Sequence, residues 1–363
     1  MKMNNKTRLI AFYLPQFHPI PENDSWWGKG FTEWTNVGRA RKLFPGHYQP
    51  HVPADLGYYD LRLPQVREAQ AAMAMSAGIE GFMYWHYWFG NGKRLLEMPF
   101  NEVLNSGKPD YPFCLGWANH SWEKKTWEDG RKNEILVEQM YSHDDYRAHF
   151  FAILDAFKDQ RYMKVNGCPI FLIWSPTSIP NFNEFMSIWN GLANDSGMPG
   201  IHFVAYASSL KIQAQLESSC NCPIALDLMA EAPRARGPVI KALNKLANTF
   251  AGVPKLVSYK SYTAMCLQNF KCADNQYPVV LPNYDHSPRS GSNAIVFLNS
   301  APKLFGKLLH GLMAKYANSK SSNANKIIFI KSWNEWGEGN HVEPDLRYRN
   351  GYIQSIRESL DNS

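Results

Sequence analysis

The chain has 363 residues, of which 45% are hydrophobic and 19% charged, a composition typical of a folded protein with a large core. Its 38 basic and 32 acidic residues give a formal charge of +6 without a basic run of the kind that neutralises a phosphate backbone, so nucleic acid is not an expected partner. The six cysteines include no C-x-x-C pair, and no stretch approaches the roughly 20 apolar residues of a membrane span, so neither a disulfide framework nor a spanning helix is predicted.

The N-terminal stretch 1–14 places basic residues before a short apolar run. Pro15, Gln16 and His18 break this run before any cleavage site built from small residues. The pattern does not predict a signal peptide, so we expect a cytoplasmic protein.

Eight short runs along the chain have the composition of buried parallel strands, because they are apolar on both faces. They cover residues 8–18, 78–89, 112–122, 169–176, 202–208, 224–233, 277–289 and 327–336. Helical spacing of apolar residues follows Pro64 and recurs over 146–157 and 304–316. The alternation predicts a parallel sheet, and the count of eight predicts closure into a (β/α)8 TIM barrel, with residues 1–363 as one catalytic domain. An open doubly wound sheet is the alternative, although no G-x-G-x-x-G follows the first strand.

Two long insertions interrupt the alternation, residues 19–63 after the first strand and residues 234–276 between the sixth and seventh strands. Long loops inside a compact domain are usually functional. We therefore expect residues 19–63 to form a lid or a wall over the mouth of the barrel.

The predicted strands change from aliphatic to polar and aromatic residues as they end, and barrel active sites lie at the carboxyl ends of the strands. Rings and hydrogen-bonding groups together suit a carbohydrate, which stacks its C–H faces on aromatic rings. Core packing is the alternative for any single ring. The candidate substrate-binding residues are His18, Trp85, His86, Tyr87, Trp117, Asn119, His120, Trp122, Tyr206, Glu231, Tyr284, Asp285, Arg289, Asn334 and Trp336.

Glu335 and Glu338 follow the last predicted strand and are the candidate catalytic residues. A straight strand would hold their carboxyl groups about 10 Å apart. Gly337 and Gly339 permit a bend that would bring the two groups to about 5–7 Å, the range in which one carboxyl acts as an acid and the other as a base or nucleophile. A solvated acidic loop, or a calcium site that also uses Glu343 and Asp345, is the alternative.

Histidines 18, 86 and 120 lie at the ends of neighbouring predicted strands, which is also compatible with a metal centre. The first strand carries no H-x-H, and hydrogen bonds to sugar hydroxyls explain these residues without a metal, so no metal is predicted. Glu231 and the pair Asp285 and Arg289 are expected either to bind substrate or to form structural ion pairs.

Longer segments resemble a known family. Residues 11–37, 43–62, 81–89, 91–119, 159–174 and 333–348, the last reading WNEWGEGNHVEPDLRY, are similar to the WbsX-type family of polysaccharide-biosynthesis glycosyltransferases. That family is related to glycoside hydrolase family 99, the endo-α-mannosidases. The resemblance covers nearly the whole chain.

The resemblance implies a (β/α)8 barrel that needs neither a metal nor a cofactor for its chemistry. It places the E-x-x-E pair of family 99 on Glu335 and Glu338. By analogy, Glu335 would be the base for the 2-hydroxyl of the substrate, which attacks C1 to give a 1,2-anhydro sugar, while Glu338 protonates the leaving oxygen. Glu338 would then activate water or an acceptor hydroxyl, with retention of the anomeric configuration.

Two residues depart from expectation. Where relatives often have W-A-N-E-N-W, this chain has His120 in place of the glutamate, which puts the sugar next to the cleaved bond in doubt. Lys331 lies inside the last predicted strand, and we expect it to pair with a carboxylate.

These features predict a carbohydrate-active enzyme that cleaves or transfers an α-linked residue of a bacterial polysaccharide, of the O-antigen (lipopolysaccharide) or capsule type, with an oligosaccharide or polysaccharide as its substrate. No D-x-D was found at a strand end to hold a nucleotide-sugar diphosphate, which favours glycosidase-like chemistry. A catalytically inactive glycan-binding barrel and a metal-dependent barrel hydrolase are the alternatives.

Overall fold

The computed structural model describes residues 7–124, 134–273, 275–317, 319 and 326–362, and contacts divide the chain into two compact units. The first unit holds residues 1–82 and 227–363, and the second holds residues 83–226. Residues 1–6, which begin the stretch read for a signal peptide, lie outside the described residues. The assignment of residues 1–363 to one catalytic domain stays a prediction.

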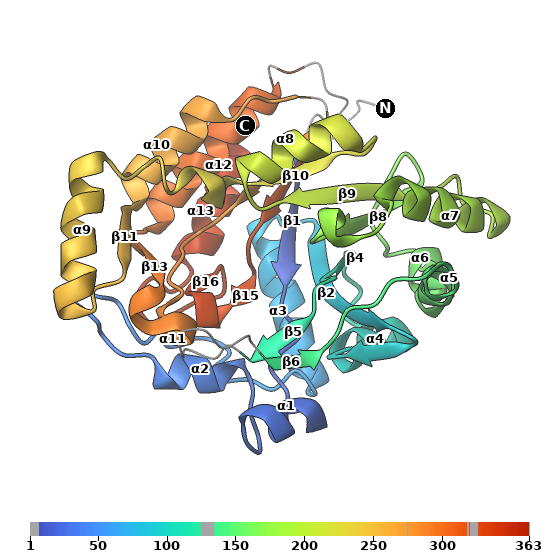
Figure 1. Cartoon of the computed structure of the whole chain (residues 1–363), viewed down its shortest axis with the longest axis horizontal. Helices are drawn as coiled ribbons and strands as arrows, with labels where there is room; N and C mark the ends of the chain where they lie inside the picture. Colours follow the sequence, from blue (N-terminus) through green and yellow to red (C-terminus); the bar gives the residue numbers. More distant parts are fainter. Residues whose placement is uncertain (1–6, 125–133, 274, 318, 320–325, 363) are drawn as a thin grey trace. The chain divides into compact units, whose positions relative to one another are not determined.

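The eight predicted strands are all present as parallel strands (Figure 1). They are β1 (Arg8–Tyr13), β2 (Gly81–Gly90), β4 (Phe113–Trp117), β8 (Cys168–Ile173), β9 (His202–Ala207), β10 (Ile224–Asp227), β12 (Gln276–Val280) and β14 (Ile327–Ile330). Each is followed by at least one helix before the next, so the predicted (β/α)8 TIM barrel is confirmed.

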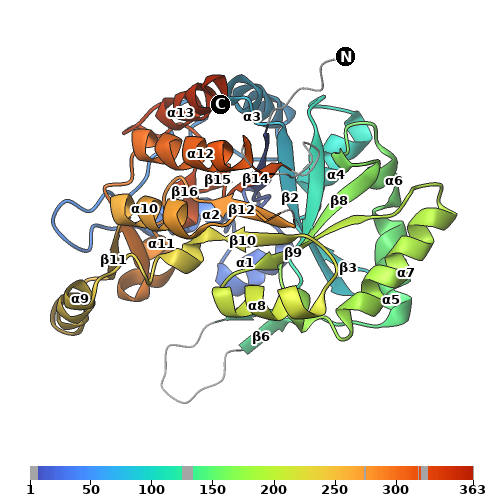
Figure 2. The same ribbon diagram turned by 90° about the horizontal axis from the view of Figure 1, so that it is seen from above.

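In the first unit β1 pairs with β14, and β14 pairs with β12, with Arg8 opposite Ile327 and Val279 opposite Phe329. The strands are rich in Ile, Val and Phe and are buried on both faces, as parallel strands covered by helices must be. Helices α3 (Pro64–Ala77), α12 (Pro302–Ala317) and α13 (Gly351–Asp361) pack side by side, as Figure 2 shows. The helices predicted from Pro64 onward and over 304–316 are thereby confirmed.

In the second unit the strand order is β10, β9, β8, β4 and β2. Leu115 of β4 lies opposite Phe171 of β8, and Ile170 of β8 lies opposite His202 of β9. The helices of this unit are α4 (Met98–Ser106), α5 (His143–Ala152), α6 (Leu154–Lys158), α7 (Phe182–Asp195) and α8 (Leu210–Ser219). The predicted helix 146–157 is therefore two short helices, which meet at Ile153, where the φ of −121° departs from helical geometry.

The two insertions contain secondary structure of their own. Residues 19–63 include α1 (Pro21–Trp27) and α2 (Glu33–Arg39), and residues 234–276 include α9 (Pro238–Ala251), β11 (Lys255–Ser258) and α10 (Tyr259–Asn269). β11 pairs with β13 (Ile295–Leu298) in a separate two-stranded sheet. None of the helices in the described part of the chain combines the length and the apolarity that crossing a bilayer would need.

Six of the eight strands end three or more residues before the predicted runs do, and two of these ends bear on the candidate site. β10 stops at Asp227, whose carboxylate accepts from the backbone N–H of Met229 at 2.8 Å and starts the 3-10 turn η2 (Leu228–Glu231). β14 stops at Ile330, and the chain then forms the two-residue strand β15 (Asn334–Glu335), the 3-10 turn η5 (Trp336–Glu338) and β16 (Asn340–His341). Glu335 thus ends the short strand β15 and Glu338 ends the turn η5, so neither lies on the barrel strand β14.

Candidate active site

The two candidate catalytic carboxylates converge on one guanidinium group. Arg289 Nη1 donates to Glu338 Oε1 at 2.7 Å and to Glu335 Oε1 at 3.3 Å, and Arg289 Nη2 donates to Glu335 Oε1 at 3.2 Å. Because one nitrogen contacts both, the two carboxylate oxygens lie within about 6 Å of each other, inside the range proposed for an acid and a base acting on one glycosidic bond.

A third carboxylate comes from the first insertion. Arg289 Nε donates to Glu33 Oε1 at 2.9 Å, and Glu33 opens helix α2. The side chain of Glu33 is buried, so its charge depends on the guanidinium for compensation. The insertion 19–63 therefore forms a wall of the carboxylate cluster, as expected, and it contributes a charged group that the sequence did not single out.

The loop between the two glutamates fits this cluster closely. A Cβ atom at Gly337 would collide with the carboxylate of Glu33 and lie 3.1 Å from Arg289 Nε. Gly339 has a φ of +56°, and a Cβ there would lie 2.9 Å from Asp285 Cβ. The two glycines thus supply close approach at Gly337 and a left-handed turn at Gly339, and the predicted bend is confirmed.

Lys331 adds a second half-buried cation. Lys331 Nζ lies 3.3 Å from Asp227 Oδ2, so the predicted pairing of this lysine with a carboxylate is confirmed. Burial opposes its charge, but the nearby carboxylates, Asp227 above all, raise the pKa of Lys331. The cluster therefore contains four acidic side chains, from Glu33, Asp227, Glu335 and Glu338, and two basic ones.

The pKa values of Glu335 and Glu338 are shifted in opposite directions. Burial first and the charge of Glu338 second raise the pKa of Glu335 to about 7. Burial also opposes the ionisation of Glu338, but Arg289, Lys331 and His286 outweigh it and lower the pKa of Glu338. Below about pH 7 the free protein thus holds one proton on the pair, and the opposite shifts place it on Glu335.

Asp285 connects the first insertion to the segment after β12. Its Oδ2 atom accepts from Gln49 Nε2 at 2.7 Å and lies 2.7 Å from His47 Nε2, and its Oδ1 atom accepts from the backbone of Ser287. Burial opposes ionisation, yet these partners lower the pKa of Asp285. Asp285 is therefore fully engaged in a structural network, whereas Arg289, four residues later, contacts the candidate catalytic pair.

Asn334 and Trp336 support the loop from behind. The Asn334 amide donates to the backbone oxygen of Leu14 at 3.0 Å and accepts from its N–H at 2.8 Å, which ties the loop to the end of β1. Trp336 Nε1 donates to Glu343 Oε2 at 2.6 Å, and its ring stacks on His341 with the centroids 3.7 Å apart. Both side chains are buried, so their predicted contact with substrate stays a prediction.

Three other candidates belong to the first unit, namely Glu231, Tyr284 and His18. Glu231 pairs with Arg234 at 3.0 Å and accepts from Asn269 at 2.7 Å, the structural alternative of the two considered. Burial and the charge of Glu338 raise the pKa of Tyr284. His18 is buried.

The acidic loop is not solvated. Glu343 accepts from Tyr59 at 2.9 Å, from Gln70 at 2.6 Å and from Trp336, and both it and Asp345 are buried. The alternative of an exposed acidic turn is therefore wrong.

In the second unit four candidate rings belong to two groups of aromatic side chains. The ring of Tyr206 stacks on Trp174 with centroids 4.2 Å apart, and Trp85 meets the same indole edge-on at 5.3 Å. Tyr87 meets Trp122 edge-on at 5.3 Å. Trp174 is half-buried and directly follows β8. The sequence analysis missed it, although it lies near the end of the predicted strand 169–176.

Other candidates of the second unit lie in its core. Trp117 Nε1 donates to the backbone oxygen of Trp88 at 2.8 Å, and its ring packs edge-on against His149. His86 Nε2 lies 2.9 Å from His149 Nε2, and burial lowers the pKa of His86 to about 3. Their roles in substrate binding stay predictions, and the structure gives both a packing role.

The last two candidates follow β4. The side chain of Asn119 bonds the backbone oxygen and N–H of Ser175 at 2.8 and 2.7 Å, so it fixes the end of β4 to the end of β8. The side chain of His120 is exposed, and its contact with substrate stays a prediction.

Comparison with known proteins identifies the family. The family model described as "Glycosyltransferase WbsX" matches residues 9–356. The chain belongs to the WbsX glycosyltransferase family. The uncharacterized protein WxcX of Xanthomonas campestris pv. campestris is 36% identical over 356 residues, which are 97% of this chain and 49% of that protein, and WxcX of a second strain is equally similar. The chain thus spans about half the length of the curated relatives that it matches.

Two solved structures of other proteins superpose on this chain. The GH99 endo-α-mannosidase of Bacteroides thetaiotaomicron superposes with a TM-score of 0.55 at 15% identity, covering 99% of this chain and 98% of that one. A glycoside hydrolase-like protein superposes with a TM-score of 0.60 at 14% identity, covering 99% of this chain and 95% of that one. At these identities the likeness shows a shared fold.

The residues that could hold a metal differ from the three histidines considered in the sequence. Among the described residues, His51, His341 and Asp345 offer three ligand atoms within 4.8 Å of one another. His51 Nδ1 lies 2.9 Å from His341 Nε2, and His341 Nδ1 lies 2.9 Å from the backbone oxygen of Glu343, so hydrogen bonds already account for this pair. None of His18, His86 and His120 belongs to this group.

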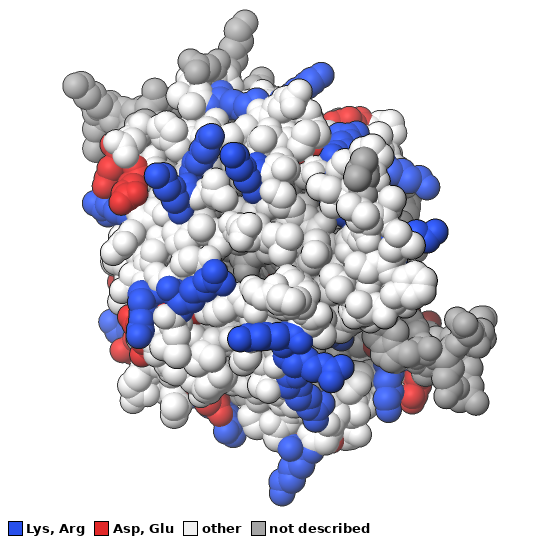
Figure 3. Space-filling view, turned by 90° about the vertical axis from the view of Figure 1, so that its left-hand side faces the viewer, with Lys and Arg blue, Asp and Glu red and all other residues white. Residues whose placement is uncertain are grey.

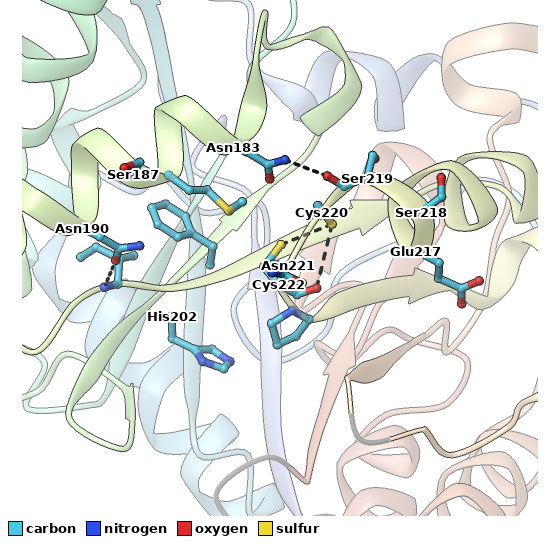
Figure 4. Close-up of a pocket in the computed structure, with 14 residues that line it drawn as sticks. Asn183, Ser187, Asn190, His202, Glu217, Ser218, Ser219, Cys220, Asn221 and Cys222 are labelled. Atoms are coloured by element: carbon cyan, nitrogen blue, oxygen red, sulfur yellow. Dashed lines mark hydrogen bonds between the residues drawn. The ribbon is translucent and has the colours of Figure 1, made fainter.

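A cavity of about 750 Å3 lies elsewhere, between α7, α8 and the starts of β9 and β10 (Figure 4). His202, Cys220 and Cys222 are among the residues that line it, and the two thiol sulfurs are 3.7 Å apart. It opens at the amino ends of these strands, whereas barrel chemistry takes place at the carboxyl ends. We therefore place the candidate active site at the carboxylate cluster and not at this cavity.

Proposed function

We propose that this WbsX chain is a carbohydrate-active enzyme that cleaves or transfers an α-linked glycosyl residue with retention, using Glu335 and Glu338 as its acid–base pair. The observation that carries the proposal is the convergence of the buried Glu335 and the half-buried Glu338 on Arg289, with their pKa values moved in opposite directions. Two carboxyl groups that share one proton are what glycosidic-bond chemistry requires.

The proposed reaction has two steps, each of which moves one proton at each carboxyl. Glu335 takes the proton of the 2-hydroxyl as O2 attacks C1, and Glu338 gives a proton to the departing glycosidic oxygen. The resulting 1,2-anhydro sugar is opened at C1 by water or an acceptor hydroxyl, which loses its proton to Glu338 while Glu335 returns a proton to O2. Two inversions at C1 give net retention.

The proton must therefore move within the pair before the reaction starts. In the free protein Glu335 carries it, as its raised pKa requires, whereas the reaction needs Glu335 ionised and Glu338 protonated. We propose that substrate binding causes this transfer, because a 2-hydroxyl that donates to Glu335 favours its ionised form. Two oxygens up to about 6 Å apart can exchange the proton through one substrate hydroxyl that lies between them.

The relatives guide the choice of substrates to test. The solved neighbour is titled an endo-α-mannosidase, and the family model is described as a glycosyltransferase, so α-mannosides and α-linked oligosaccharides of bacterial O-antigens and capsules are the first substrates to test. We propose that the acceptor, water or a sugar hydroxyl, decides between hydrolysis and transfer.

The test compares the wild type with Glu335→Gln, Glu338→Gln and the exposed control Glu358→Gln on a panel of such oligosaccharides. We expect each of the first two variants to lose about 10²-fold or more in kcat, the range for a positioned acid or base, and the control to match the wild type. NMR of the first product should show the anomeric configuration of the substrate.

A second substrate separates the two roles. In a glycosyl fluoride the fluoride ion leaves without being protonated, so the reaction needs no general acid. Glu338→Gln should therefore form the anhydro sugar from it at a nearly normal rate, whereas Glu335→Gln should not. Near-normal turnover of the glycan by both variants contradicts the assignment. Binding without product in the wild type and in Glu338→Gln alike would identify a glycan-binding barrel, and loss of activity on chelation would identify a metal-dependent hydrolase.

A further inference from the structure

Helix α9 in the second insertion has its apolar side turned away from the protein. Four of its large apolar side chains are exposed: Ile240 at 51%, Leu243 at 61%, Leu246 at 56% and Phe250 at 84%. At about 100° per residue these positions fall on one stripe about 120° wide. No other element in the described part of the chain exposes more than one large apolar side chain, so the stripe is a distinct surface feature.

Polar side chains attach the opposite side of α9 to the fold. The Asn244 amide donates to the backbone oxygen of Pro254 at 2.8 Å and accepts from the N–H of Leu256 at 2.7 Å. Asn248 donates to the backbone oxygens of Val253 and Ser292, both at 2.8 Å. A helix of a globular protein normally buries its apolar stripe and exposes its polar side. In α9 the polarity is reversed, and the asparagines hold it in that orientation.

The surroundings of the stripe are basic. Residues 232–273 contain seven Lys and Arg and neither Asp nor Glu, although the whole chain has a formal charge of only +6. Lys241 and Lys245 lie on α9 itself and are exposed, as is Lys255 at the start of β11. Figure 1 shows α9 at the edge of its unit, and Figure 3, which turns that side toward the viewer, shows Lys and Arg over the face with few Asp or Glu.

We propose that α9 is an in-plane membrane anchor, which inserts the stripe Ile240, Leu243, Leu246 and Phe250 into the surface of a bilayer that contains anionic lipids. An apolar stripe on a helix that carries Lys on its polar side and no acidic residue is the pattern of interfacial helices. At about 100° per residue Lys241 and Lys245 lie on the side of α9 away from the stripe, where their ammonium groups can meet the phosphates of the headgroup layer.

The size of the stripe favours a lipid surface over a protein partner. A 14-residue helix is about 20 Å long, so one apolar stripe covers on the order of 200 Å2, whereas a stable protein interface needs about 800 Å2 from each partner. An interfacial helix needs only one such face, because only that face enters the bilayer. The anchor does not depend on the proposed acid–base pair, and its test requires no turnover.

The test measures cosedimentation of the full chain with vesicles. We expect binding to vesicles of equal parts phosphatidylcholine and phosphatidylglycerol, weaker binding to phosphatidylcholine alone, and weakening with added salt. Leu243→Glu/Leu246→Glu and, separately, Lys241→Glu/Lys245→Glu should each reduce the partition coefficient roughly tenfold or more.

Matched controls lie on other helices. Met75→Glu on α3 replaces one exposed apolar side chain by a charge, and Lys303→Glu/Lys307→Glu on α12 reverses two exposed charges at the same spacing as Lys241 and Lys245. Both should bind as the wild type does, and circular dichroism should show all variants folded.

Three outcomes overturn the proposal. They are absent binding to the anionic vesicles, equal loss in the α9 and control variants, and a dimer in light scattering that Leu243→Glu/Leu246→Glu dissociates, which would assign the stripe to a second copy of the chain.

Discussion

Arg289 is the residue on which the charges of the candidate site depend. It contacts Glu33, Glu335 and Glu338, and burial lowers its pKa less than these three carboxylates raise it, so it stays charged. A buried cation shared in this way lowers the pKa of the nearest carboxylate most, which is Glu338 at 2.7 Å. Arg289 thereby keeps the pair at one proton instead of two near neutral pH.

The pH dependence of kcat/KM should report this shared proton. As pH rises through about 7, Glu335 loses the proton that the pair needs, so the rate should fall above that pH with an apparent pKa of about 7. Arg289→Met removes the cation, which raises the pKa values of both carboxyls and should move the alkaline limb to higher pH by about a unit or more. An alkaline limb that stays in place or moves to lower pH in Arg289→Met would contradict this account.

Single residues show what the sequence could reveal of the site. Glu335 and Glu338 were found because they follow a buried strand and flank a glycine, and the structure brings them to one cation. Lys331 was found because a charge inside an apolar run needs a partner. Glu33 and Asp227 were missed, since one lies in a long insertion and the other inside an apolar strand run, and neither position carries a local signal of the ion pair that its side chain makes across the fold.

At the scale of elements, the loop from Lys331 to His341 determines the geometry of the pair. Its path is fixed by Asn334 on the backbone of Leu14, by Trp336 on Glu343 and by the close approach of Gly337 to Glu33. Apolar runs located all eight strands, because burial on both faces leaves an unmistakable composition. The ends of β10 and β14 were placed too late, because side-chain capping and a tertiary loop end a strand before its apolar run ends.

Gly337→Ala tests whether the loop must approach Glu33 this closely. The added methyl group would occupy the place of the Glu33 carboxylate, so we expect a loss in kcat of roughly tenfold or more through displacement of the Glu33–Arg289 contact. Gly191→Ala on α7 is the matched control, since its Cβ meets open space, and it should leave kcat unchanged and stabilise the fold by about 0.5–1 kcal/mol. Normal kinetics of Gly337→Ala would show that the loop tolerates a looser fit.

At the scale of the whole molecule, the average charge conceals its distribution. A formal charge of +6 among 70 charged residues predicts nothing about a surface, and the basic residues of 232–273 are too widely spaced to form a run. Only the fold shows that this stretch carries a helix with its apolar side outward. The sequence therefore excluded a spanning helix on composition but could not indicate an interfacial one, which depends on which side of α9 faces the protein.

The buried histidines should make the whole fold sensitive to acid. Burial lowers the pKa values of four fully buried histidines, which are His51, His86, His149 and His341. In the unfolded chain they titrate near 6.5, so the stability that they contribute as neutral rings is present above that pH and is lost as pH falls below it. Glu335 and Glu343 act in the opposite direction, because their pKa values are raised to about 7 and their contribution is lost as pH rises from about 4.5 to 7.

Four histidines against two glutamates leave a net uptake of about two protons on unfolding, so the free energy of unfolding should fall by roughly 2–3 kcal/mol per pH unit between about pH 6 and 5. Urea denaturation at several pH values measures this slope. His86→Gln removes one proton acceptor of the unfolded chain and should make the slope shallower by about one proton, whereas Glu343→Gln removes an opposing group and should make it steeper by a similar amount. Because the two variants change the slope in opposite directions, a general loss of stability in either cannot imitate the result. A slope that is flat in the wild type, or that changes in the same direction in both variants, would show that these histidines are already protonated in the folded protein.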